Sequence, residues 1–369
     1  MNKLHIRYII TFFLFVNLIY AQDKPNTIET KADISLFKQI DTAKVKFGLY
    51  YDQRYNFNSE FHNGTNIANE FAIVTNRIYF ESKYDDKLSF RLRYNLNAST
   101  NPALEFAYLE YRFKPNWSIA MGKLITAWGT YEIDYNGANV YLYSTVGGNI
   151  NVFDPGVNIA YHTNKQRFNL QFITAGNNFV DPNYKRKALG YLFLWEGHLF
   201  DGKMHTRYGY SLMQHNQDKY YNWITLGNRV NLKQWAFELD WMYGFRNINY
   251  TNTTGFDNRI EGVSYVKENA TALSAKYLFK NWNPFFKAIY SSRNDLNTGG
   301  TYQVKSLQSA IEYYPFRSSI FMKDLRLFAV YNYQNYTYQK NYSNLPKANQ
   351  HQILCGMRWL MPIVRKNQL

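Results

Sequence analysis

The chain is poor in cysteine and in long apolar runs, and each shortage excludes a class of protein. Cys355 is the only cysteine among 369 residues, so no disulfide can form within the chain. A small secreted scaffold held together by disulfides is therefore excluded. After the N-terminal 21 residues, no apolar run approaches the roughly 18 residues of a membrane-spanning helix. A bundle of such helices is excluded as well.

The sequence also lacks the motifs that carry common enzymatic and metal chemistry. Its histidines form no H-x-x-x-H or H-E-x-x-H pair, so nothing predicts a metal site. A G-x-S-x-G nucleophile motif and a phosphate-binding P-loop are both absent. Ser211 and His215 lie four residues apart on one predicted strand, which is only a weak sign of a lipolytic enzyme. We predict no catalytic residues, no metal and no cofactor, and we do not expect an enzyme.

What the sequence does contain is a repeated alternation of apolar and polar residues. In Leu88–Asn97 the even-numbered positions are apolar or aromatic and the odd-numbered positions are polar. In Phe237–Arg246 the odd-numbered positions are apolar or aromatic, and Glu238 and Asp240 fall on the other side. Successive side chains of a strand point to opposite faces, so each stretch has one side suited to lipid. One such strand fits a soluble antiparallel sheet, but many of them in an exported chain predict a bacterial outer-membrane β-barrel.

The N-terminus predicts export. Lys3 and Arg7 precede the apolar run Tyr8–Ile19, and Ala21 is a small residue where a signal peptidase would cut. These features are typical of a cleaved secretory signal peptide. The expected organisation is a signal peptide over 1–21, a periplasmic N-terminal segment over 22–41 and a transmembrane β-barrel over 42–369. The predicted location is the bacterial outer membrane, in contact with outer-membrane lipid.

Aromatic residues and positive charge are both abundant. Tyr (34), Phe (27) and Trp (8) make up 19% of the chain, which suits the aromatic girdles that barrels place at both membrane interfaces. The mean hydropathy is nevertheless −0.47, as expected when lipid-facing residues alternate with polar ones. The formal net charge of +15 is compatible with nucleic acid, acidic lipid or anionic solutes as partners. Export argues against nucleic acid.

The alternating stretches number sixteen, an even count that suits a porin-sized barrel. They lie near 43–55, 70–84, 88–97, 103–113, 117–122, 156–163, 168–175, 189–199, 205–214, 220–230, 235–246, 264–278, 284–291, 302–314, 325–336 and 349–361. The predicted short turns, rich in turn-forming residues, are Asp85–Lys87, Lys114–Asn116, Asn164–Arg167, Phe200–Met204, Asn231–Gln234 and Phe279–Asn283. The predicted longer connections are Asn56–Asn69, Lys123–Pro155, Gly176–Ala188, Asn247–Val263 and Ser292–Thr301. Short turns of such barrels face the periplasm, and a polar tail is expected after the last strand.

One segment resembles a known family. Leu104–Asp134 contains Ala107-Tyr108-Leu109-Glu110-Tyr111 on one strand, the turn Lys114-Pro115-Asn116, a strand ending in Gly122-Lys123, and then Trp128-Gly129 with Glu132. This segment resembles the porin O and P family of sixteen-stranded outer-membrane porins, often called phosphate-selective. The resemblance implies passive diffusion of small hydrophilic or anionic solutes through a water-filled channel. It also implies a homotrimer and a constriction loop over about 123–155 that folds into the pore.

The expected loop differs from the family pattern in its charge. Phosphate-selective members are expected to crowd arginine and lysine at the constriction. Between Leu124 and Pro155 there is no Arg or Lys, whereas Glu132 and Asp134 are acidic. The side chains expected to brace the loop against the wall are Tyr131, Tyr135, Tyr141 and Tyr143.

Strand parity, together with the expected path of the loop for Lys123, Glu132 and Asp134, identifies the residues that we expect to line the pore. These are Arg77, Arg91, Arg93, Glu110, Lys123, Glu132, Asp134, Arg207, Arg229, Glu238, Asp240, Arg326 and Arg358. Basic positions outnumber acidic ones on the predicted wall, which favours a weak preference for anions. Glu132 and Asp134 on the loop are expected to face Arg91 and Arg93 across the narrowest point. Such opposed charges would create a transverse field that passes ions of both signs.

Two other functions stay open at this point. A structural or accessory barrel subunit of an outer-membrane complex would have a plugged lumen and a docked C-terminal tail. An outer-membrane lipolytic enzyme would need a serine, a histidine and a polar orienting residue at the rim, and no such set stands out. A secreted glycan-binding β-sandwich is disfavoured by the lack of disulfides and by sixteen regular hairpin arms. The sequence therefore favours a channel.

Overall fold

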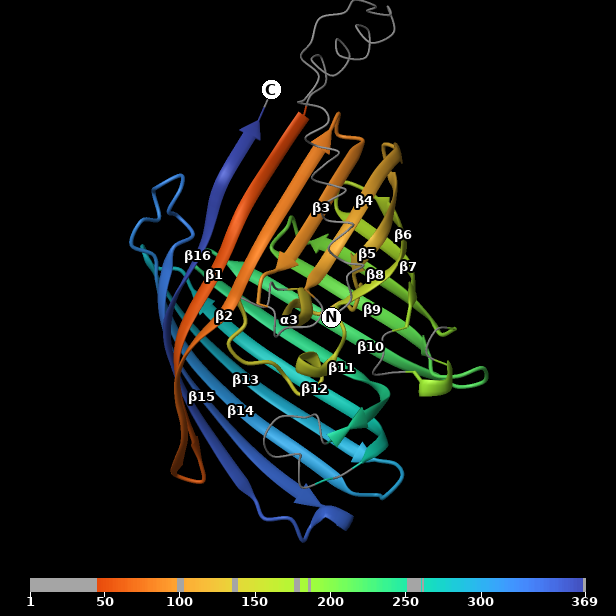
Figure 1. The fold of residues 1–369 in the computed structure, drawn as a ribbon, viewed down its shortest axis with the longest axis vertical. Helices are drawn as coiled ribbons and strands as arrows, with labels where there is room; N and C mark the ends of the chain where they lie inside the picture. The colour runs from red at the N-terminus through yellow and green to blue at the C-terminus, as the bar shows by residue number, and fades with distance from the viewer. Residues whose placement is uncertain are drawn as a thin grey trace, which may run out of the picture. The chain divides into compact units, whose positions relative to one another are not determined.

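The chain folds into a barrel of antiparallel strands in a computed structural model that describes residues 45–97, 103–134, 139–175, 180–184, 187–250, 260 and 262–367. The predicted signal peptide and N-terminal segment, 1–41, lie outside these residues, as does Tyr135. Over the described ranges, sixteen strands close into one barrel, which confirms the strand number predicted from the alternation (Figure 1). No helix within those ranges is long and apolar enough to cross a bilayer.

The strands follow one another around the barrel in sequence order. They are β1 (Val45–His62), β2 (Thr65–Tyr84), β3 (Leu88–Asn95), β4 (Leu104–Lys114), β5 (Trp117–Ile125), β6 (Phe153–His162), β7 (Gln166–Thr174), β8 (Leu189–Leu199), β9 (Met204–Gln214), β10 (Tyr220–Leu232), β11 (Trp235–Asn249), β12 (Val263–Tyr277), β13 (Trp282–Asp295), β14 (Thr301–Tyr313), β15 (Arg326–Gln339) and β16 (Ala348–Asn367). Each strand pairs with the next one, and β16 pairs with β1. Because the sheet is closed, it has no free edge whose backbone groups would be left without partners in lipid.

Short helical turns occur only in connections, within the part of the chain that the structure describes. The helical turn α3 (Tyr131–Asp134) and the 3-10 turn η2 (Gly147–Asn149) lie between β5 and β6. Two further 3-10 turns are η3 (Pro182–Tyr184), after β7, and η6 (Lys340–Tyr342), after β15. Among the described residues, the connection between β5 and β6 therefore contains two of these turns, and each of the other two connections contains one.

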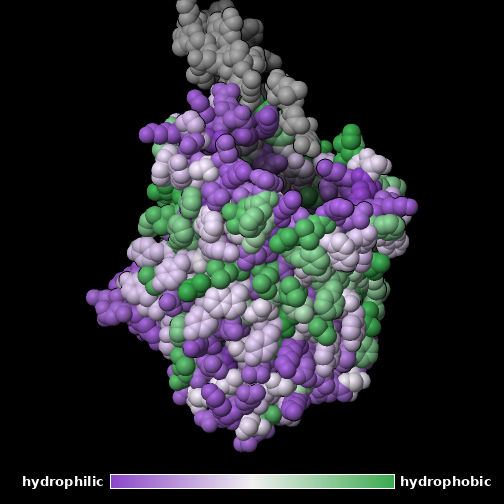
Figure 2. All heavy atoms as spheres, turned by 180° about the vertical axis from the view of Figure 1, so that it is seen from behind, coloured by the Kyte–Doolittle hydropathy of each residue, from purple (hydrophilic) through white to green (hydrophobic). Residues whose placement is uncertain are grey.

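Alternation along the strands separates an outer side from an inner side. On β11, Leu239 is 44% exposed whereas its neighbour Asp240 is 4% exposed. Exposed large apolar and aromatic residues occupy the same outer parity on the neighbouring strands. Figure 2 shows hydrophobic side chains gathered across the middle of one face, with hydrophilic ones above and below them. Aromatic residues beside the short turns, such as Trp117, Phe168 and Trp235, are exposed, as expected of an interfacial girdle.

Two predicted loops are wrong because the strands extend further than the alternation does. Asn56–Asn69 is mostly strand: β1 and β2 form one long hairpin that turns at Asn63 and Gly64, whose φ values are 49° and 83°. Ser292–Thr301 is also shorter than predicted, because β13 continues to Asp295. Beyond the lipid, both faces of a strand meet water or loops, so the apolar–polar period fades although the hydrogen-bonded ladder continues.

The predicted polar tail at the C-terminus is wrong in the same way. β16 runs to Asn367 and pairs with β1, with Val364 opposite Leu49 and Pro362 opposite Tyr50. Ile363 is skipped in this register and forms a β-bulge. Proline has no backbone N–H to donate to the ladder, and a bulge is where a strand accommodates it.

Candidate functional site

The interior of the barrel is occupied by the connection between β5 and β6, residues 126–152, called here the internal loop. The loop leaves the wall at β5 and returns at β6, yet its described residues contact strands on the other side of the barrel. Asp240 on β11 accepts a hydrogen bond from the Tyr131 backbone N–H, 3.0 Å away. Arg54 on β1 donates to the Val140 carbonyl oxygen at 3.0 Å. The loop can reach both strands only by crossing the interior, as Figure 1 shows for α3.

The first anchor of the internal loop is the helical turn α3. The Asp240 carboxylate accepts the backbone N–H groups of Tyr131 and Glu132, at 3.0 and 2.8 Å. These N–H groups have no partner within the turn, and an anion is favoured at this end of a helix. The Glu132 carboxylate in turn lies 3.0 Å from Nζ of Lys287 on β13, and both groups are buried. Two wall residues therefore fix both the backbone and a side chain of α3.

The second anchor is a buried charge cluster on β11, β12 and β13. Arg246 and Arg293 both bind the Glu268 carboxylate, with Arg246 Nη2 at 3.0 Å and Arg293 Nε at 3.2 Å. All three side chains are at most 1% exposed. Arg293 donates to the Thr145 carbonyl oxygen at 2.7 Å, and Arg246 donates to the Asn149 carbonyl oxygen. The cluster therefore holds the returning half of the loop, including η2, against the wall.

The third anchor is close packing around Trp128 and Gly129, the dipeptide on which part of the family resemblance rests. The indole of Trp128 is 1% exposed and meets Trp223 of β10 edge-on, with ring centroids 5.5 Å apart. Thr225 donates its hydroxyl to the Trp128 carbonyl oxygen. A Cβ atom at Gly209 on β9 would lie 2.3 Å from that same oxygen. Only glycine at this position lets the loop backbone approach the strand so closely.

The far end of the loop lies against β14, β15, β16 and β1. The Tyr141 hydroxyl donates to the Glu312 carboxylate at 2.9 Å. The Arg54 guanidinium lies 4.6 Å from the centre of the Tyr141 ring, and Arg358 donates to the Asn139 side chain. Tyr141 therefore braces the loop against the wall, as predicted from the sequence. Because these strands lie across the barrel from β5 and β6, the loop divides the interior.

The interior on each side of the loop is a charged cavity. The β5–β9 cavity, of about 170 Å³, is lined by the charged side chains Arg91, Arg167, Arg207, Glu110, Asp134 and Glu196. The loop-tip cavity, of about 490 Å³, is lined by the charged side chains Lys276, Arg326, Arg358, Glu238, Glu312 and Asp324. Each cavity thus carries three basic and three acidic groups. Neither cavity has a strong excess of one sign.

Most interior charges are engaged in ion pairs along the wall. The pairs are Arg77 and Arg93 with Glu105, Arg207 with Glu196 and Asp134, Arg229 with Glu238, Arg326 with Glu312, and Arg358 with Asp52. Arg91 instead donates to the hydroxyls of Tyr79 and Tyr108, at 2.8 and 3.2 Å. Paired charges still present polar atoms to water, but their fields cancel beyond a short distance.

The internal loop itself contributes few ionised side chains. Burial raises the pKa of Tyr131 to about 12 and the pKa of Tyr143 to about 12, so both hydroxyls stay neutral at physiological pH. Burial also raises the pKa of the Asp134 carboxyl, although Arg207 beside it acts in the opposite direction. Glu132 and Asp134 are the acids that the described part of the loop adds to the interior.

The structure places the predicted pore-lining residues on the inner side of the barrel, with one exception. Lys123 shares the outer parity of β5 with the exposed Met121 and Ile125. Its Nζ donates to the Leu104 carbonyl oxygen at 2.7 Å. The prediction that Lys123 lines the pore is therefore wrong. The predicted strand ended at residue 122 and the loop began at Lys123, whereas β5 continues to Ile125 and keeps Lys123 on its outer side.

The predicted opposition of the loop acids to Arg91 and Arg93 is also wrong in its partners. Glu132 is buried against Lys287, and Asp134 lies 3.0 Å from Arg207. Asp134 and Arg91 do line the same β5–β9 cavity. Opposed charges are thus present across that cavity, but only one of the two loop acids takes part.

Several interior residues escaped the sequence analysis. Arg54 lies at the end of the predicted first strand, and Arg293 was assigned to a loop, so neither was placed by parity. Glu268 lies on the inner side of β12 with neighbours Ala270 and Ala272, whose small size hides the alternation. Following the parity of β1 and β13 to their observed ends would have found Arg54 and Arg293. Among the described residues, no group of three or more His, Cys, Asp or Glu side chains is arranged to hold a metal ion.

Comparison with protein families decides what kind of protein carries this interior. The family described as phosphate-selective porin O and P matches residues 44–358, most of the chain. The chain belongs to this family. The porin is therefore a channel of the bacterial outer membrane and not an enzyme. No curated protein matches its sequence.

Solved porin structures share the fold of this porin at low sequence identity. The outer-membrane channel DcaP of Acinetobacter baumannii is 12% identical, with 91% of this chain and 100% of that chain covered and a TM-score of 0.61. The trimer form of in-vitro folded OmpT of Vibrio cholerae is 13% identical, with 85% and 99% covered and a TM-score of 0.57. An anion-selective porin from Comamonas acidovorans is 11% identical, with 87% and 100% covered and a TM-score of 0.56. At these identities the likeness concerns the barrel fold alone.

Proposed function

We propose that this porin passes small hydrophilic solutes of either charge by passive diffusion, with only a weak preference among ions. The observation that carries the proposal is the balance of three basic and three acidic groups in both the β5–β9 cavity and the loop-tip cavity. Rings of charge of one sign give strong ion selectivity, whereas opposed charges orient dipolar solutes and admit both signs. Strong selection of phosphate would need a cluster of basic groups without acidic partners.

We further propose that the internal loop is the constriction of this channel. Its described residues touch β11 through Asp240 and β1 through Arg54, so it narrows the passage between these walls. The loop provides hydrogen-bonding groups and no basic side chain. The basic groups that a solute meets are therefore on the wall. A solute would therefore pass between acidic or neutral loop groups and a mixed wall.

Two properties of the mature protein are part of the same proposal. Cleavage of residues 1–21 as a signal peptide would deliver the chain to the periplasm, supported by Lys3, Arg7 and the apolar run that follows. Assembly as a homotrimer is supported by the trimer form of the similar OmpT. The anion selectivity named for the Comamonas acidovorans porin is expected to be weak here, since acidic groups accompany the basic ones.

Reversal potentials in a salt gradient test the proposal. The purified porin in a planar bilayer should show a small reversal potential. The double variant Arg167→Gln/Lys276→Gln should shift it toward cations, and Asp134→Asn/Glu196→Gln should shift it toward anions. The four side chains are 26–46% exposed. The changes leave the buried groups around Glu132 and Glu268 intact, and Asp134→Asn/Glu196→Gln leaves the Arg207 charge without its two acidic partners, which adds to the shift toward anions. Strong anion selectivity of the unaltered porin, or shifts of both variants in one direction, would refute the proposal.

A further inference from the structure

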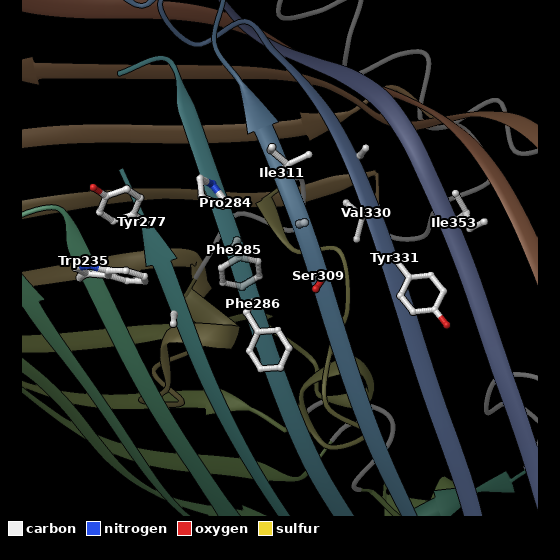
Figure 3. A pocket seen from close by; sticks show the side chains of 13 residues that line it. Trp235, Tyr277, Pro284, Phe285, Phe286, Ser309, Ile311, Val330, Tyr331 and Ile353 are labelled. Atoms are coloured by element: carbon white, nitrogen blue, oxygen red, sulfur yellow. The ribbon is translucent and has the colours of Figure 1, made fainter. Parts of the chain in front are cut away.

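The outer wall of the barrel has an apolar groove across β11 to β16. Its volume is about 680 Å³. The outward residues in its floor are small, namely Ala275, Ser309 and Ala329, and larger side chains border them. In Figure 3 the rings of Phe286 and Tyr331 stand out from the wall with Ser309 between them. Ser309 on β14 pairs with Phe286 on β13 and with Tyr331 on β15. The groove therefore crosses these three neighbouring strands at this level.

The groove lies in the half of the wall that faces the short turns. Two of its lining residues flank such turns: Trp235 is the first residue of β11 and Tyr277 is the last residue of β12, and their ring centroids lie 4.7 Å apart. Short turns are on the periplasmic side of outer-membrane barrels. The groove therefore opens into the periplasmic leaflet of the membrane, whose lipids carry phosphate headgroups at that depth.

A chain of ring contacts connects the groove to a positive charge at the rim. Tyr277 stacks on Phe279 with ring centroids 6.3 Å apart. The Lys280 Nζ lies 5.5 Å from the centre of the Phe279 ring, and Lys280 is exposed. The ammonium group is thereby held on the outer side of the rim, directly beyond the aromatic end of the groove.

The rim of this sector is basic overall. The turns that follow β10, β12 and β14 carry Lys233, Lys280, Arg317 and Lys323 and a single acid, Asp324. Asp324 lines the loop-tip cavity inside the barrel, and Arg317 donates to Asn283, which is buried on the inner side of β13, so both charges face the interior and the three lysines remain on the rim. Basic groups at a membrane surface attract anionic lipid. The outer rim below the groove is therefore complementary to a negatively charged headgroup.

The connection between β14 and β15 adds an interfacial surface beside the same rim. Ile320 is 78% exposed and Phe321 is 63% exposed, which is unusual for a polar turn. The Phe321 carbonyl oxygen accepts a hydrogen bond from the Trp359 indole, 3.3 Å away, and Trp359 lies on the outer parity of β16. Apolar side chains next to Lys323 suit the boundary between headgroups and acyl chains.

We propose that the groove binds an anionic phospholipid of the periplasmic leaflet. One acyl chain lies over Ala275, Ser309 and Ala329, and the phosphate lies at Lys280 and Lys323. Apolar contact with the groove would hold acyl chains of any phospholipid, whereas the two lysines select a negative headgroup. At this groove a second copy of this chain is a poorer occupant, because a chain that is itself basic, with a net charge of +15 before residues 1–21 are removed, brings no negative headgroup to the basic rim.

Native mass spectrometry of the full-length mature porin tests this assignment. The probes are phosphatidylglycerol and phosphatidylcholine with identical acyl chains, added to the detergent-purified protein. Phosphatidylglycerol should be retained in preference to phosphatidylcholine. Lys280→Gln/Lys323→Gln should lower this preference by about fivefold for each lysine removed. Ser309→Leu/Ala329→Leu should fill the groove and reduce retention of both lipids.

Matched variants and a folding assay make each outcome decisive. Ala107→Leu places a leucine on the outer side of β4, away from the groove, and should leave lipid retention unchanged. Heat-dependent mobility on a denaturing gel verifies that every variant forms a barrel. Equal retention of the two lipids by the unaltered porin, or an unchanged preference in the lysine variant, would overturn the proposal. Dissociation of an oligomer by the groove variant, without a change in lipid retention, would show a subunit interface instead and would overturn it too.

Discussion

Glu132 Oε2 lies 3.0 Å from Lys287 Nζ, and this buried ion pair joins the helical turn α3 of the internal loop to β13. The same lysine donates to the Leu142 carbonyl oxygen at 2.9 Å. One ammonium group thus ties two separate parts of the loop to one point on the wall. A loop held in this way keeps the passage at a fixed width, whereas a loop hinged only at its ends would fluctuate.

Replacing Lys287 with Met should loosen the loop. The substitution leaves the Glu132 carboxylate buried beside an apolar side chain, a change that costs about 3–5 kcal/mol in comparable buried pairs. Because the sixteen-stranded ladder does not depend on this pair, the cost should release the loop and not unfold the barrel. Single-channel recordings should show a larger mean conductance and more open-channel noise.

The double variant Lys287→Met/Glu132→Gln provides the control for this prediction. It removes the buried charge that the single variant leaves without a partner. Conductance and noise should therefore return part of the way to those of the unaltered porin. Lys305→Met, on the outer side of β14, removes a lysine without touching the loop. Identical recordings from Lys287→Met and Lys305→Met would contradict the role of the pair.

Tyr141 should hold the far end of the loop mainly through its ring. Tyr141→Phe removes the hydrogen bond to Glu312 but keeps the ring under Arg54, whereas Tyr141→Ala removes both contacts. A cation–π contact of a desolvated arginine contributes about 2 kcal/mol, so alanine should raise the conductance more than phenylalanine does. Equal conductance of the two variants would mean that the hydrogen bond alone fixes the loop.

A charge on the outer wall should weaken the barrel itself. Leu239 faces outward near the middle of β11, next to the buried Asp240. Leu239→Arg should lower the free energy of unfolding in lipid by about 2–4 kcal/mol, the usual cost of arginine near the bilayer midplane. Urea titration of the porin in lipid vesicles measures this, with Leu239→Phe as the uncharged control. A small effect of arginine would place Leu239 outside the lipid.

Removing the end of β16 should destabilise the seam of the barrel. Deletion of residues 362–369 removes the end of β16 that pairs with β1, including Val364 opposite Leu49. The temperature at which the barrel loses its heat-dependent gel mobility should fall. Deletion of only Gln368 and Leu369, which follow the last strand residue Asn367, is the matched control. If both deletions leave this temperature unchanged, the terminal pairs contribute nothing to stability.

The sequence predicts the wall of this barrel well because lipid and water impose a period of two residues on it. Glu238 and Asp240 are on the inner side and Leu239 is on the outer side, as their parity predicts. The same argument fails where the strands leave the lipid, as in the hairpin around Asn63. There no lipid contacts the outer side of the strands, so the apolar–polar alternation ends, whereas the backbone hydrogen bonds between the strands continue.

The interior is harder to predict because its contacts depend on the path of the loop. Parity places Lys287 inside, but it cannot say that Glu132, 155 residues away in the chain, is its partner. The path depends on local details such as Gly209, where the absence of a side chain admits the Trp128 backbone. Such details have no periodic signature, and a resemblance in the Trp128-Gly129 dipeptide indicates only that a loop of this kind exists.

The pairing of β1 with β16 also determines the order in which this protein can fold. Val45–His62 cannot complete its ladder until Ala348–Asn367 has been synthesised and exported, about three hundred residues later. Pairings so distant in sequence make for slow folding, and until they form the growing sheet keeps two open edges that can pair with other chains. The pairing of the final strand with the first is therefore the step that removes both open edges, and until then the incomplete sheet is exposed to pairing with other chains.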